Sequence, residues 1–179
     1  SGVGGGPTLV LSVAAGTPIA RFEAVFGDGT PVVRAMPNTP AAIGRGITAI
    51  VGNAAAGSGH LSLAEALLGV VGTVVRLEDE DQMDAVTAVS GSGPAYVFHL
   101  IECMAAAGVA EGLPEALALV LARETVAGAG ALATVSGEAP DRLRTNVTSP
   151  GGTTAAGLDV LMDGERGLGP LLRETIAAA

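Results

Sequence analysis

Lysine is absent from this chain of 179 residues, and all nine of its basic residues are arginines. The absence excludes Schiff-base chemistry and a phosphate-binding lysine of the Walker type. Aromatic residues make up only 2% of the chain and the formal net charge is −9. A nucleic-acid partner is therefore not expected, because it would require basic patches and aromatic stacking platforms. The single cysteine, Cys103, permits no internal disulfide and favours a reducing compartment.

The first twenty residues carry no charge, but glycines and prolines interrupt them repeatedly. A membrane-spanning helix needs about 20 mainly apolar residues without such breaks, and an export signal would carry a basic leader. We therefore expect a cytoplasmic protein without a membrane partner. The chain does not begin with methionine, and residues 1–6 are typical of a loop cut open. A truncated product is expected.

Hydrophobic residues make up 49% of the chain, which is ample for a packed core. Up to about Leu77, short apolar runs alternate with helical segments. The runs predict strands at residues 8–13, 32–36, 47–51 and 73–77, with helices at about 17–27 and 61–71 between them. Strands that are nearly all apolar and alternate with helices predict a mostly parallel sheet covered on both faces.

An acidic run at residues 78–81 marks a change, because no further strand signal follows it. Helical spacing of apolar residues from Val97 onward and a helix start at Pro114 predict an all-helical second part. We predict two domains, residues 1–80 and 81–179. The helical part is rich in alanine and glycine and poor in bulky side chains, so we expect it to gain its core by packing on a second copy.

Three clusters of glycine, proline and hydroxyl residues stand out, at residues 36–40, 90–94 and 148–154. The first follows a strand, where ligands of open α/β sheets bind. Asn38 offers an amide donor and an acceptor, which suits a carboxamide such as nicotinamide. A turn that uses Asn and Pro for backbone reasons is equally open. In the second cluster, Ser92 is explained by a helix cap alone, although its flanking glycines would let a ligand approach and Thr87 lies near the same bend.

The third cluster is harder to explain as a simple cap. A Pro-Gly-Gly turn runs into Thr153 and Thr154, which leaves free N–H groups at the start of a helix. Such a terminus carries about half a positive charge and binds carboxylate or phosphate. Hydroxyls of Ser149 and Thr154 add donors without formal charge. A cap needs one hydroxyl rather than four, so we predict a small-anion site.

Metal chemistry is not expected, because no His, Cys and acidic residues stand at metal-ligand spacing. We expect His60 to be a surface residue, His99 to be partly exposed and Cys103 to be a small buried hydrophobe. No pairing of a nucleophile with a base is evident either. The chemistry is therefore expected to belong to a bound cofactor.

Together these clusters resemble one family, the 1-pyrroline-5-carboxylate reductases. The matching segments, in order and spacing, are residues 12–16, 33–40, 88–96 and 143–154. The resemblance implies an incomplete Rossmann-type parallel sheet followed by a helical dimerisation domain, in homodimers that often form larger rings. It also implies reduction of 1-pyrroline-5-carboxylate to proline with NADPH or NADH, the last step of proline biosynthesis.

The resemblance also assigns roles to residues. The residues implied to hold the substrate carboxylate are Ser149, Gly152, Thr153 and Thr154. Those implied to lie near the substrate ring are Ser92 and Thr87, with Thr87 as a conceivable proton donor to the ring nitrogen; water is the other source. Those implied to border the nicotinamide are Ala15, Pro37 and Asn38.

One departure from the family is serious. The family begins with a strand and a G-x-G-x-x-G turn that wraps the pyrophosphate, and this sequence has no such motif. We expect a fragment that lacks about half of the dinucleotide domain and binds the adenosine end of the cofactor poorly. The alternative function is therefore an inactive module that dimerises and binds substrate without cofactor. A 3-hydroxyacid dehydrogenase ranks last, because such enzymes generally rely on a lysine.

Overall fold

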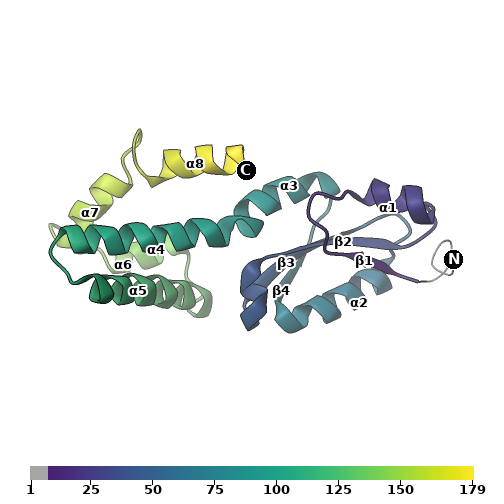
Figure 1. Cartoon of the computed structure of the whole chain (residues 1–179), viewed down its shortest axis with the longest axis horizontal. Coiled ribbons are helices and arrows are strands. Elements are labelled where there is room, and N and C mark those ends of the chain that lie inside the picture. Colours follow the sequence, from purple (N-terminus) through teal and green to yellow (C-terminus); the bar gives the residue numbers. More distant parts are fainter. Residues whose placement is uncertain (1–7) are drawn as a thin grey trace. The chain divides into compact units, whose positions relative to one another are not determined.

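The structure is a computed structural model that describes residues 8–179, so the glycine-rich start that was interpreted as an opened loop lies outside the described residues. It divides into two compact units, which separate between Pro94 and Ala95. Strands and helices form the first unit and helices alone form the second, so the predicted order of an α/β part and an all-helical part is confirmed (Figure 1). The predicted domain boundary at residue 80 stays a prediction.

Within residues 8–179 the sheet has four strands in sequence order: β1 (Val10–Ser12), β2 (Val32–Pro37), β3 (Gly46–Gly52) and β4 (Gly72–Arg76). β1 pairs with β2, and β3 with β4, in parallel, whereas β2 and β3 are antiparallel. Two of the three described pairings are parallel, as expected for a mostly parallel sheet, and the antiparallel pairing of β2 with β3 makes the sheet mixed. A parallel pairing requires a crossover of a dozen or more residues, and residues 38–45, with the short 3₁₀ helix η1 (Thr39–Ile43), are too few.

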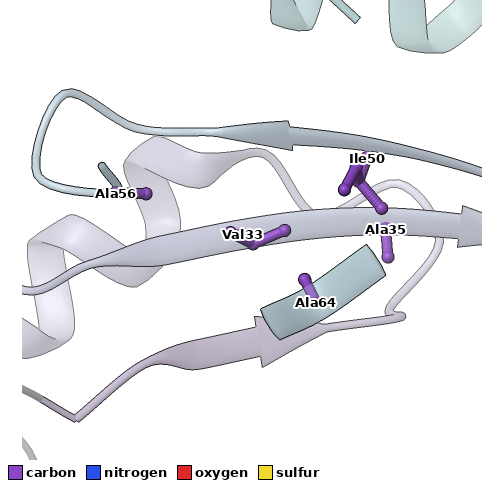
Figure 2. Close-up of a cluster of buried hydrophobic side chains, with 5 residues drawn as sticks. All are labelled: Val33, Ala35, Ile50, Ala56 and Ala64. Atoms are coloured by element: carbon purple, nitrogen blue, oxygen red, sulfur yellow. The ribbon is translucent and has the colours of Figure 1, made fainter. Parts of the chain in front are cut away.

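One face of the sheet packs on α2 (Ser58–Leu68). Its fully or nearly fully buried side chains are Val33, Ala35, Ile50, Ala56 and Ala64 (Figure 2). Several of these are alanines, which let the helix backbone approach the strands closely. Alternate residues of a strand point to opposite faces, so the neighbours of these strand residues are available to build a second core.

The second core lies on the other face, beneath α1 (Ile19–Phe26) and α3 (Met83–Val86). Its buried members are Ile19, Val32, Val51 and Met83. Burial of these side chains contributes on the order of 1.5–3 kcal/mol each, relative to leaving them in water. Both faces of the sheet are thus covered, as the apolar strands indicated.

An ion pair completes this second face. Arg34, only 7% exposed, has its Nη1 2.7 Å from Oε1 of Glu80. The backbone N–H of Ile19 donates to the same carboxylate oxygen at 2.9 Å. No side chain next to α1 caps it, since its N-cap residue is Pro18. A glutamate from the distant acidic run therefore anchors the first turn of α1.

The second unit contains five helices among its described residues. They are α4 (Gly93–Ala110), α5 (Glu115–Val135), α6 (Pro140–Asn146), α7 (Thr153–Leu161) and α8 (Leu168–Ala178), of which α4 begins in the first unit. Among the unit's described apolar side chains only Ala118 and Ala122 are buried. The stretches Glu80–Ala110 and Glu115–Val135 are long and apolar enough to span a membrane by length and composition alone. The helical unit therefore exposes an unusual amount of apolar surface.

Candidate functional site

One group of candidate residues lies in the sheet unit, at one edge of the sheet. β1 and β2 run in parallel with Ser12 opposite Arg34, so Ala15, which follows β1, and Pro37, which ends β2, lie at the same edge. Ala15 is exposed. It precedes Gly16, whose φ is +67°. A Cβ placed on Gly16 would have no described heavy atom within 4 Å, so the space beside this residue is open. The backbone is therefore open at these small residues, and the nicotinamide site implied here stays a prediction. Residues 8–179 contain no G-x-G-x-x-G loop that fits a pyrophosphate.

Asn38 follows β2 and uses both ends of its amide within the first unit. Its Nδ2 donates to the carbonyl oxygen of Ser90 at 3.2 Å, and its Oδ1 accepts from the backbone N–H of Ile47 at 3.0 Å. Of the two interpretations that the sequence left open, these bonds favour a backbone role for the side chain. The place of Asn38 beside the nicotinamide stays a prediction.

A π-helical turn, η4 (Thr87–Gly91), joins α3 to α4. Its defining bond runs from the backbone N–H of Ser92 to the carbonyl oxygen of Thr87, at 2.8 Å. Gly91 lies against the end of β2, since a Cβ built on it would come within 2.9 Å of the Met36 Cε. Two clusters that are separate in the sequence, 36–40 and 87–92, therefore meet in one unit, and π-turns of this kind are frequent at functional sites.

The hydroxyl groups at this turn differ in whether they are hydrogen-bonded to the protein. Thr87 Oγ1 donates to the carbonyl oxygen of Met83 at 2.8 Å. Proton donation by Thr87 to a ligand would require this bond to break. Ser92 is half-buried, and its hydroxyl makes no hydrogen bond within residues 8–179. The Ser90 hydroxyl is likewise held, since it donates to the carbonyl oxygen of Val86 at 3.0 Å. Of the three hydroxyls at the turn, that of Ser92 is therefore available to a ligand and those of Thr87 and Ser90 are bonded to the protein.

A separate group of candidate residues lies in the helical unit, between α6 and α7. Gly151 adopts a φ of +69°, and the backbone N–H of Gly152 donates to the carbonyl oxygen of Ser149 at 3.0 Å. This tight turn leads directly into α7, whose start has no side-chain cap from the described residues. The first N–H groups of a helix have no partner inside the helix, so this terminus presents unsatisfied donors.

Hydroxyl groups surround that terminus. Thr148 donates to the carbonyl oxygen of Arg144 at 2.6 Å and so belongs to the end of α6. Ser149, Thr153 and Thr154 are exposed, and their hydroxyls make no hydrogen bond within the described part of the chain. The geometry is that of an anion site: backbone donors, an uncapped helix dipole and three free hydroxyls.

The expectation that Cys103 is buried is wrong. The thiol is exposed on α4, because α4 has little cover in the single chain. Its Sγ lies 3.5 Å from His99 Nε2, and His99 Nδ1 lies 3.0 Å from Glu102 Oε2. His60, expected at the surface, is half-buried, and its Nδ1 has no hydrogen-bond partner within residues 8–179. No group of three or more His, Cys, Asp or Glu side chains among residues 8–179 is placed to hold a metal ion.

Comparison with known proteins identifies relatives of both units. A family model described as pyrroline-5-carboxylate reductase dimerisation matches residues 80–179. The chain is 48% identical over 153 residues to the pyrroline-5-carboxylate reductase of Synechocystis sp., covering 86% of this chain and 57% of that protein. It is 43% identical over 171 residues to that of Pisum sativum, covering 96% and 62%.

Solved structures agree. A pyrroline-5-carboxylate reductase from Coxiella burnetii superposes with a TM-score of 0.90 at 37% identity, covering 95% of this chain and 62% of that one. The Plasmodium falciparum pyrroline carboxylate reductase with NADP bound gives a TM-score of 0.83 at 31% identity, covering 95% and 67%. The chain spans little more than half the length of the first of the curated relatives it matches.

Proposed function

We propose, from the premise that the chain belongs to the pyrroline-5-carboxylate reductase family, that the protein reduces 1-pyrroline-5-carboxylate to proline with NADPH or NADH. This is the last step of proline biosynthesis. The observation that carries the proposal is the open start of α7 with its free hydroxyls, which fits the carboxylate of this substrate. The Plasmodium relative with NADP bound supports the cofactor.

The carboxylate is held by the backbone amides of Thr153 and Thr154 and by the hydroxyls of Ser149 and Thr154. Gly152, whose own N–H is bonded to the Ser149 carbonyl oxygen, shapes the turn that presents them. Charge-assisted hydrogen bonds to an anion are about twice as strong as neutral ones, and the positive end of the α7 dipole adds to them. A ring tethered in this way presents a defined face of its C=N bond. Such orientation removes several kcal/mol from the barrier, provided that the reacting atoms are held about 3–3.5 Å apart.

On the sheet unit, Ala15, Pro37 and Asn38 border the nicotinamide. The bound cofactor supplies the hydride that adds to the carbon of the C=N bond. The small side chains at the strand ends let the ring lie close to the backbone. Thr87 and Ser92 lie beside the substrate ring, where the Thr87 hydroxyl or a water donates the proton that the ring nitrogen takes up.

The assembly is a homodimer that buries the apolar faces of α4 and α5 against a second copy. Half-exposed leucines and valines on these helices, with only two buried alanines between them, support this partner over a membrane. The family model, described as a dimerisation model, begins at residue 80 and supports domains at 1–80 and 81–179. Rings of dimers and a cytoplasmic location complete the proposal.

The test measures NAD(P)H oxidation by the complete gene product that contains this sequence, with 1-pyrroline-5-carboxylate as substrate. Replacing Ser149 and Thr154 together by alanine removes two donors to the carboxylate. We expect the KM for the substrate to rise about tenfold to hundredfold, from roughly 1.5–3 kcal/mol of lost binding. The control is Thr145→Ala, which removes an exposed hydroxyl bonded to its own helix and should leave KM unchanged.

Unchanged kinetics in the double variant would contradict the carboxylate site. A complete gene product that binds proline but does not oxidise NADPH or NADH would contradict the reductase itself and favour the inactive dimerisation module.

A further inference from the structure

We infer that the side chain of Asn38 is a positioning residue, which locks the end of β2 to the π-helical turn η4, and that it does not bind the cofactor carboxamide directly. The inference rests on the proposed function, because these two segments are the ones that border nicotinamide and substrate. It concerns contacts inside the first unit alone. Three observations carry it.

The first observation is a carbonyl group that lacks its ordinary partner. In a continuous α-helix the carbonyl oxygen of Ser90 would accept from the backbone N–H at position 94. Pro94 occupies that position, and proline has no N–H to donate. The Asn38 Nδ2 donates to this oxygen instead, at 3.2 Å. A side chain on a strand end therefore supplies the hydrogen bond that the helix cannot make.

The second observation is on the other end of the same amide. The last antiparallel pair between β2 and β3 joins Pro37 to Thr48. One residue further on, the Asn38 Oδ1 accepts from the backbone N–H of Ile47 at 3.0 Å. The amide thus continues the pairing of β2 with β3 one residue beyond Pro37. The same bond fixes the orientation of the amide, because an Asn38 oxygen directed at Ile47 leaves the nitrogen directed at Ser90.

The third observation is packing beside these bonds. The Met36 Cε occupies the space next to Gly91, and a Cβ there would approach it to 2.9 Å. Asn38 and Met36 are both half-buried. The turn that carries Thr87 and Ser92 is therefore fixed to the strand end by one hydrogen bond and one close apolar contact, and any shift of the turn would disturb both.

The consequence concerns the distance over which the hydride moves. In the proposed function the strand end would border the nicotinamide and the π-turn would border the substrate ring, so the Asn38 amide would fix the spacing between hydride donor and acceptor. Misplacement of reacting groups by about 1 Å can cost about a hundredfold in rate. A positioning residue should therefore affect the chemical step, whereas a cofactor ligand should affect cofactor binding.

The decisive variant is Asn38→Asp, in the complete gene product. Its carboxylate keeps an acceptor for Ile47 and loses the donor to Ser90. We expect kcat to fall about tenfold to hundredfold. The KM values for NADPH and for 1-pyrroline-5-carboxylate should stay within about threefold of those of the parent protein. The primary deuterium isotope effect measured with 4-deuterated NADPH should increase, because hydride transfer becomes slower than product release.

The matched control is Asn53→Asp, at the other end of β2. Asn53 also uses both ends of its amide, accepting from the Val32 N–H and donating to Glu23 and Thr30, but it does not contact η4. Its variant should lower the melting temperature and leave the isotope effect unchanged.

A second readout needs no cofactor. Amide hydrogen exchange should be at least tenfold faster at Ser92 in Asn38→Asp than in the parent protein, with Ile47 still protected, and unchanged at Ser92 in Asn53→Asp. The inference is overturned if Ser92 exchange is unaltered, or if Asn38→Asp raises the KM for NADPH tenfold at constant kcat. A parent protein without reductase activity would refute the proposed function, and the exchange result would still decide the role of Asn38.

Discussion

Glu80 accepts hydrogen bonds from two segments far from it in the sequence, the start of α1 and the strand β2. The second of these bonds comes from Arg34, a guanidinium that is almost completely buried. A buried charge is tolerated only when it is paired. The acidic run at residues 78–81 therefore does more than shape a solvated turn, because one of its carboxylates neutralises the core arginine.

We expect Glu80→Ala to lower the free energy of unfolding by about 3 kcal/mol, because it leaves Arg34 buried and unpaired. The control is Glu65→Ala, which breaks the ion pair with Arg76. The side chains of Arg76 and Glu65 are 40% and 42% exposed. Exposed pairs contribute at most about 1 kcal/mol, so the control should cost much less. Urea unfolding followed by circular dichroism measures both, and equal losses would contradict the role given to Glu80.

At the scale of elements, the parallel pairing of β3 with β4 begins where two glycines lie opposite each other, Gly46 and Gly72. Gly72 has a φ of +147°, and a Cβ there would lie 1.9 Å from the carbonyl oxygen of Gly46. Only glycine permits both this backbone conformation and this approach. The start of the pairing is therefore specified by two missing side chains.

Gly72→Ala should destabilise the sheet by about 3 kcal/mol, through backbone strain and the clash with Gly46. Gly69→Ala, three residues earlier, is the matched control. Gly69 has a helical φ of −61° and open space around it, so its replacement should be neutral or stabilise by about 0.4–1 kcal/mol. Thermal unfolding of the two variants tests the pair, and a stable Gly72→Ala protein would contradict the account of the pairing.

Most elements could be predicted from local pattern. Apolar runs indicated all four described strands, and the helical spacing from Val97 onward indicated the all-helical second part. The short helix α6 (Pro140–Asn146) was missed because its seven residues carry few apolar side chains. The antiparallel pairing of β2 with β3 was missed because strand direction depends on the length of the connection, whereas the apolar pattern shows only burial.

Composition indicated the candidate residues of the site, but it did not indicate their interactions. Clusters rich in glycine, proline and hydroxyl groups mark positions where the backbone is unusual, so Asn38, Thr87 and Ser92 were visible as candidates. The bond between Asn38 and Ser90 joins residues 52 apart, and no local pattern indicates such a partner. Pro94 was the available signal, since it shows that one carbonyl nearby must find a donor elsewhere.

At the scale of the whole molecule, the two units differ in how they are stabilised. The sheet unit has two apolar cores of its own. The helical unit has almost none, and large side chains on its helices are about half exposed, such as Leu117 at 46% and Leu121 at 48% on α5. Surfaces of this kind are typical of protein interfaces, which agrees with the homodimer proposed above.

Replacing Leu117 and Leu121 by glutamate should convert the dimer to a monomer, because charged groups would have to be buried without partners. Sedimentation velocity measures the mass. The control is Val25→Glu on α1, a position that is 74% exposed in the sheet unit, and it should keep the dimer mass. Should the leucine variant remain dimeric, these two residues lie outside the interface.

The carbonyl of Ser90 links two positions that no motif connects. Proline at position 94 leaves the Ser90 carbonyl oxygen without its helical N–H donor, and the asparagine at position 38 supplies a donor in its place. The two positions should therefore change together among homologous proteins. Where position 94 is not proline, the asparagine at position 38 should be free to vary; where position 94 is proline, the asparagine should be retained. The hydrogen bond between Asn38 and the Ser90 carbonyl should therefore be detectable as covariation between positions 38 and 94 in homologous sequences, even if neither position is invariant.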